Sequence, residues 1–139
     1  MDHPWDKCWT TFVERLAEQI RSGSTEEMLT SFYGGKSVTW CGTLDEKDLD
    51  ELAPSVAVSL PPAEMDVGQG RHDCLDCLGL PIEEASRSRW EKIEIGDQVR
   101  FTATFTDDYP PFPAIAIKEL KSGRVVVLVS LRKATPLAD

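Results

Sequence analysis

The chain has 139 residues, of which 41% are hydrophobic, and its 24 acidic and 15 basic side chains give a net charge of -9. This length and apolar content predict a single domain, residues 1–139, with one hydrophobic core. The negative charge repels a phosphate backbone at long range and therefore weighs against nucleic acid as the partner.

The N-terminal part of the chain carries most of the acidity. Residues 1–84 hold 6 basic and 17 acidic side chains, whereas residues 85–139 hold 9 and 7. The longest apolar runs, such as Val125–Val129, are far shorter than the roughly 18 residues of a membrane-spanning helix. The N-terminus also has no apolar segment after a basic start. We therefore expect a cytoplasmic protein that does not bind membranes.

Two short helices are predicted in residues 1–33. Apolar residues recur at spacings of three and four over Trp5–Ile20, which is typical of an amphipathic helix. Ser24 and Glu27 have the spacing of a capping box, so a second helix is expected there, ending at Gly34-Gly35. Its buried stripe is expected to consist of Met28, Leu29 and Phe32.

Alternating patterns then predict strands. Apolar and polar residues alternate over 36–44 and again over 55–60, where Pro61-Pro62 ends the run because proline cannot donate to a sheet ladder. The acidic residues 45–52 are expected to form a loop or a helical turn. Residues 63–79 have no clear period and are expected to be mostly loop.

The second half of the chain predicts a short helix followed by strands. The helix is expected within Pro81–Trp90, with proline in its first turn. Strands are expected over 99–105, 114–120 and 124–131, and Lys121-Ser122-Gly123 is expected to form the hairpin turn between the last two. The expected fold class is therefore mainly β with N-terminal helices (α+β).

Two segments resemble a known family. Gly35–Thr43 is similar to the first strand, and Trp90–Phe101, with its Gly-Asp pair, to a later strand entry, of small bacterial OB-fold domains of the tRNA-anti-like kind. The resemblance covers roughly residues 30–120 and implies a five-stranded OB-like barrel over 34–134, preceded by the helical segment 1–33. It also implies a binding scaffold, since OB-folds present one sheet face and its loops to oligonucleotides, oligosaccharides or proteins.

A cysteine-containing segment is the sharpest local motif. His72, Cys74 and Cys77 form an H-x-C-x-x-C arrangement whose C-x-x-C spacing allows two thiolates to reach one zinc ion, with Cys41 or Cys8 completing the site. A second ligand pair downstream is absent, so ordinary loop cysteines and a redox pair stay open as alternatives. We expect no structural disulfides, and no cofactor apart from this possible zinc.

Aromatic residues divide into two groups. Trp40 is in phase with the apolar face of its strand and Trp90 ends the predicted helix, and both are expected in the core. Tyr109 and Phe112 lie in a proline-rich connection that could present exposed rings to a partner. The sequence as a whole contains no nucleophile motif and no phosphate-binding glycine loop, so we expect that the protein is not an enzyme.

The function expected first is a non-catalytic OB-fold module that binds a protein partner with a basic surface, such as an immunity, inhibitor or adaptor protein would. Its candidate partner-binding residues are Tyr109, Phe112, Arg100 and Lys118. One alternative is a single-stranded nucleic-acid-binding domain that uses Arg100, Lys118 and Arg124 of the less acidic second part. Another is a zinc-binding or redox protein acting through the cysteine motif.

Overall fold

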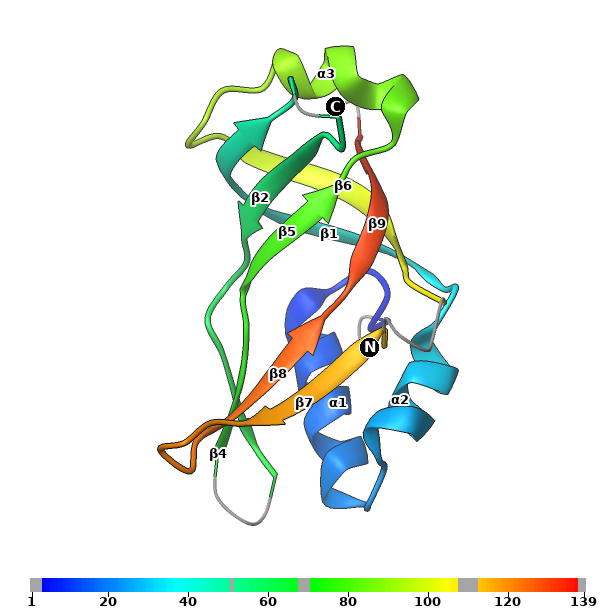
Figure 1. Ribbon diagram of the computed structural model, residues 1–139, viewed down its shortest axis with the longest axis vertical. Helices are drawn as coiled ribbons and strands as arrows, with labels where there is room; N and C mark the ends of the chain where they lie inside the picture. The colour runs from blue at the N-terminus through cyan, green and yellow to red at the C-terminus, as the bar shows by residue number, and fades with distance from the viewer. Residues whose placement is uncertain (1–3, 51, 68–70, 108–112, 138–139) are drawn as a thin grey trace.

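The computed structural model describes residues 4–50, 52–67, 71–107 and 113–137 (Figure 1). In this part the chain is mainly β with two N-terminal helices, as predicted. The helical elements are α1 (Trp9–Arg21), α2 (Glu26–Tyr33), the 3-10 turn η1 (Glu84–Ser86) and α3 (Arg87–Glu91). The strands are β1 (Ser37–Asp48), β2 (Ser55–Ser59), β3 (Ala63–Asp66), β4 (Arg71–Cys74), β5 (Cys77–Pro81), β6 (Gln98–Phe105), β7 (Ile115–Glu119), β8 (Val125–Val129) and β9 (Leu131–Pro136).

The strands of the described part form two sheets. The five-stranded sheet has the order β5-β2-β1-β6-β9 and the four-stranded sheet the order β3-β4-β8-β7. The β4–β8 ladder is parallel and the other ladders are antiparallel. An isolated parallel bridge between Ile82 and Ala134 connects the two edges of the five-stranded sheet. Figure 1 shows this sheet above the β7–β8 hairpin and the two N-terminal helices.

The strand order is OB-like once consecutive strands are taken together. The pairs β2–β3, β4–β5 and β8–β9 each leave one sheet and enter the other, so each pair corresponds to one long bent strand. With β1 and β6 these pairs make the five expected strands, and α3 lies between the third and the fourth. The structure divides these five strands into shorter segments and adds one more. Pro61-Pro62 breaks the first pair because proline offers no ladder N–H, and β7 adds a hairpin before β8.

Two segments expected as loops are strands. Residues 45–48 continue β1 past a bulge in its pairing with β2, between Leu44 and Glu46. Leu44 also bonds to the connection before β6, where Gly96 N donates to Leu44 O at 2.7 Å and Leu44 N donates to Asp97 O at 2.9 Å. Residues 63–79 hold β3, β4 and the start of β5. These strands are only four or five residues long and change sheets between β4 and β5, so they show no sustained alternation in the sequence.

Both N-terminal helices differ in detail from the prediction. The first begins at Trp9 rather than Trp5, and the N-cap of the second is Thr25, whose Oγ1 accepts a hydrogen bond from Met28 N at 3.2 Å, rather than Ser24. The side chain of Met28 is 57% exposed, so its expected burial was wrong. The buried residues of α2 are Leu29, Thr30 and Tyr33. None of the helices in the described ranges is long and apolar enough to cross a membrane.

An aromatic cluster fastens the helices to the five-stranded sheet. The ring of Phe12 on α1 lies 5.0 Å from Trp40 on β1, 5.3 Å from Tyr33 on α2 and 5.8 Å from Phe105 on β6, measured between centroids. Trp40 is 1% exposed, which confirms its predicted core position. Each such aromatic pair adds about 0.5–1.5 kcal/mol beyond the area that it buries. The inward side of β1 and β6 is therefore fixed by large rings.

Trp90 is also fully buried, as predicted. Its indole Nε1 donates to Ala134 O at 3.1 Å, which connects α3 to β9. Lys47 on β1 binds the C-terminal end of α3, because its Nζ donates to Glu91 O at 3.2 Å and to Ile93 O at 2.8 Å. The connection between β5 and β6 is thus tied to both β9 and β1.

A glycine at the centre of β1 provides a test of this packing. A Cβ at Gly42 would lie 2.5 Å from Ser59 O and 2.6 Å from Val58 Cγ1, whereas a Cβ at Gly79 meets nothing within 4 Å. We expect Gly42→Ala to lower the free energy of unfolding by about 1–3 kcal/mol, since β1 and β2 must separate. We expect Gly79→Ala to change it by less than about 0.5 kcal/mol. Urea unfolding measures both, and equal effects would contradict the close approach.

Candidate nucleic-acid interface

Part of the five-stranded sheet is free of carboxylates on its exposed side although the chain is strongly acidic. The segment 37–44 of β1, together with β6 and β9, contains no Asp or Glu. These strands are neighbours in the sheet, so their outward side chains share one surface, which we call the outer face. Its residues are Ser37, Thr39, Cys41, Thr43, Gln98, Arg100, Thr102, Thr104, Arg132, Lys133 and Thr135, all exposed or half-buried.

Hydroxyl and amide groups of the outer face bond to one another across the strands. Ser37 Oγ lies 3.0 Å from Thr104 Oγ1, and Gln98 Nε2 donates to Thr43 Oγ1 at 2.6 Å. These contacts hold the side chains in place while leaving further donor and acceptor capacity on each hydroxyl group. The face can therefore offer ordered hydrogen-bonding groups to a polar ligand.

Three cationic side chains lie on this face. Arg100 is exposed on β6, opposite Cys41, and its guanidinium has no hydrogen-bond or ion-pair partner among the described residues. Arg132 lies on β9 opposite Thr104 and contacts Asp107 at 2.6 Å. Lys133 is the next residue of β9 and is exposed. The face is therefore positive in a chain whose net charge is -9.

A groove of about 410 Å³ lies beside Arg100, between the α3–β6 connection and the end of β9. Lys92 and Arg100 line it together with Gln98, and Asp97 is its acidic group. The Lys92 ammonium, like the Arg100 guanidinium, has no hydrogen-bond or ion-pair partner in the described part of the chain. The groove extends the cationic surface beyond the sheet.

An acidic patch borders this region. It consists of exposed carboxylates from the end of β1 and from the connection before β6: Glu46, Asp48, Asp50, Glu94 and Asp97. The two segments lie side by side because Leu44 bonds to Gly96 and Asp97 through the backbone. Within the described ranges none of these carboxylates forms an ion pair. Two large apolar side chains, Ile95 and Leu52, are exposed beside them.

The structure separates the residues that the sequence proposed for partner binding. Arg100 lies on the five-stranded sheet, whereas Lys118 lies on β7 of the four-stranded sheet. Arg124 precedes β8 and forms an ion pair with Asp73. Tyr109 and Phe112 lie outside the described residues. Of the proposed residues that the structure describes, Arg100 belongs to the outer face and Lys118 and Arg124 do not.

The cysteine motif is spread over two strands of different sheets. His72 and Cys74 lie on β4, and Cys77 begins β5. Cys74 is buried, and its desolvation, together with the nearby Asp76 carboxylate, raises the pKa of its thiol to about 12. The exposed Cys77 thiol lies 3.9 Å from Asp45 Oδ2.

All four cysteines are free thiols. Cys8 is the N-cap residue of α1, where hydrogen bonding from Thr11 lowers its pKa. Cys41 is exposed on β1. The described residues contain no group of three or more His, Cys, Asp or Glu side chains arranged to hold a metal ion. Zinc binding by His72, Cys74 and Cys77 stays a prediction.

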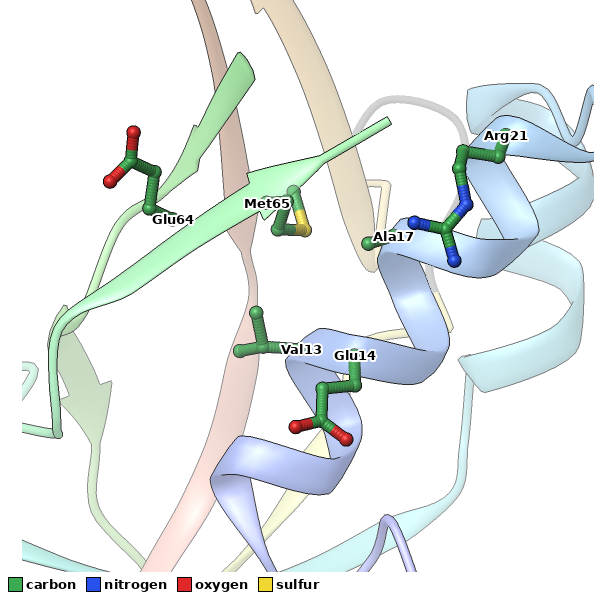
Figure 2. Close-up of a pocket in the computed structure, with 6 residues that line it drawn as sticks. All are labelled: Val13, Glu14, Ala17, Arg21, Glu64 and Met65. Atoms are coloured by element: carbon green, nitrogen blue, oxygen red, sulfur yellow. The ribbon is translucent and has the colours of Figure 1, made fainter. Parts of the chain in front are cut away.

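A smaller pocket of about 170 Å³ lies between α1 and β3 (Figure 2). Its floor consists of the buried Val13, Ala17 and Met65. Glu14 on α1 and Glu64 on β3 border the floor from two different elements, as Figure 2 shows. The pocket's volume is below the roughly 300–1,000 Å³ of common small-molecule sites.

No protein-family model matches the chain, and no curated protein matches it. Among solved structures, a lipoprotein from Klebsiella pneumoniae subsp. pneumoniae, described provisionally as nucleic acid-binding, aligns over 86% of this chain and 84% of its own, with 14% identity and a TM-score of 0.39. The mitochondrial single-stranded DNA binding protein of S. cerevisiae aligns over 76% and 97%, with 12% identity and a TM-score of 0.38. Because both scores are low, the OB-like assignment rests on the strand pairing described above.

Sequence reasoning missed Arg132 and Lys133. Their strand was expected to end at residue 131, so both fell outside the predicted elements. The available signal was the absence of Asp and Glu from three separate β segments of an acidic chain. Only the pairing of β1 with β6 and of β6 with β9 shows that these segments form one face.

The four thiols provide a test of the burial around the cysteine motif. Because the thiolate is the reactive form, we expect iodoacetamide at pH 8 to alkylate Cys41 and Cys77 in the native protein while Cys74 stays unmodified until urea unfolds the chain. Peptide mass spectrometry identifies the labelled positions. Labelling of Cys74 as fast as Cys77 in the native protein would show that β4 is not packed as described.

Proposed function

We propose that this protein is a non-catalytic OB-like binding module whose outer face binds single-stranded nucleic acid. The observation that carries this proposal is the gathering of Arg100, Lys133 and the Asp107-paired Arg132 on strand segments that contain no Asp or Glu, in a chain of net charge -9. Such segregation of charge provides a local site for phosphate groups that the net charge alone would disfavour.

The chemistry of the face suits the backbone of a single strand more than its bases. Phosphate oxygens accept hydrogen bonds from guanidinium, ammonium and hydroxyl groups, and the face offers all three. Its eleven residues include no aromatic side chain on which a base could stack. We therefore expect binding with little sequence preference and a strong dependence on salt concentration.

Arg100 is the residue to test first. We expect Arg100→Gln to weaken binding of a fluorescein-labelled oligothymidylate at low salt by about five- to tenfold, since one phosphate contact is lost. Lys118→Gln removes one charge from the other sheet and serves as the control, with an expected change below about twofold. Fluorescence anisotropy measures both. An equal loss in the two variants would point to net charge rather than to the outer face.

The acidic patch supports a second candidate, a protein partner with a basic surface. Ile95 follows Glu94 of the patch and Leu52 lies two residues after Asp50, and exposed apolar side chains beside charged ones are typical of protein interfaces. Charge complementarity would select a basic partner and speed its association. A cytoplasmic location, in which we expect either function, stays a prediction.

The patch can be tested with matched charge changes. We expect Glu46→Gln combined with Glu94→Gln to abolish recovery of a basic protein that the wild type retains from the lysate of its source at low salt. Glu14→Gln combined with Glu18→Gln removes the same charge from the exposed side of α1 and should leave recovery unchanged. Affinity purification with quantitative mass spectrometry gives the comparison. Equal recovery with both double variants would rule the patch out.

A further inference from the structure

Lys133 has an unusual backbone conformation. Its φ is +58°, and it is the one non-glycine residue of the described part with a positive φ. A lysine disfavours this region because its Cβ crowds the neighbouring carbonyl oxygen, and glycine is the residue that adopts it without strain. A strained residue of this kind is worth explaining by what its side chain does.

The strain coincides with a β-bulge. Thr102 pairs with Thr135 and Thr104 with Arg132, so Ala103 alone faces two residues of β9, Lys133 and Ala134. A bulge whose first residue is left-handed is normally built with glycine at that position. Here a lysine occupies it.

The bulge changes which side chains are exposed. In an unbroken strand, alternation from the buried Leu131 would place residue 133 on the inward side. The extra residue instead leaves both Arg132 and Lys133 accessible and returns Ala134 to the core, where its exposed fraction is 0%. The bulge therefore adds a cation to the strand without burying it.

Nothing in the described part of the chain explains the lysine by a structural contact. Its ammonium has no hydrogen-bond or ion-pair partner among these residues, and its backbone oxygen accepts a hydrogen bond from Thr135 Oγ1 at 3.3 Å. Glycine would keep that backbone contact and remove the strain. The ammonium of Lys133 is therefore available to a ligand.

We propose that Lys133 is a phosphate-binding residue, placed by the β9 bulge beside Arg132 so that two adjacent cations contact the phosphodiester backbone of a single strand. This proposal rests on the proposed function of the outer face. It adds that the backbone strain at Lys133 is retained for ligand binding, at a cost in stability.

Lys133→Gly separates the two effects. We expect this variant to melt at a higher temperature than the wild type, because the strain is relieved, and yet to bind labelled oligothymidylate about fivefold more weakly at low salt. The slope of log affinity against log salt concentration should fall by about 0.7, the value for one phosphate contact on a single strand. Lys133→Arg keeps the charge and the strain and should retain both the affinity and the slope.

The outcomes distinguish the role of Lys133 from the proposed binding of a single strand by the outer face. If the wild type binds no oligothymidylate at low salt, the proposed function fails and the role of Lys133 fails with it. If the wild type binds and Lys133→Gly keeps the same affinity and salt slope, the binding function of the outer face is supported and only the role of Lys133 is overturned. A folded Lys133→Gly variant with a raised melting temperature and a reduced slope supports the inference.

Discussion

The packing of Trp40, Phe101 and Phe105 on the inward side of two neighbouring strands determines what the rest of the molecule can present. Their side chains are at most 1% exposed, and they lie on β1 and β6, which pair directly. Because side chains alternate along a strand, burying these rings directs their chain neighbours, such as Thr39 and Arg100, outward. A shift of one residue would bury the guanidinium and expose the rings, so the core fixes the outer face.

The same packing leaves two chemically different surfaces close together. The outer face carries cations and hydroxyl groups, and the acidic patch begins where β1 passes its bulge at Leu44/Glu46. Lys47, bonded to two backbone carbonyls, positions the connection that brings Glu94 and Asp97 to the patch. An anionic strand bound on the outer face would therefore be repelled at this end, which limits how far it can extend across the sheet.

The parts of this fold that the sequence predicts are those held by local pattern. The strands β1 and β6 alternate over many residues, and both were expected. The strands β3, β4 and β5 were not expected, because each is only four or five residues long, and β4 and β5 also depend on pairing with the distant strands β8 and β2. Arg100 could be proposed from its strand alone. Lys133 could not, because its exposure depends on a bulge that exists only in the pairing of β9 with β6.

We propose that the outer face, rather than the net charge of the whole chain, determines the binding of a single strand. Titration of the isotope-labelled protein with oligothymidylate, followed by amide chemical shifts in two-dimensional NMR spectra, tests it most directly. We expect shifts concentrated on β1 before Leu44, on β6 and on β9, and decreasing as salt is added. Shifts centred on the β7–β8 hairpin, or no shifts at low salt, would contradict it.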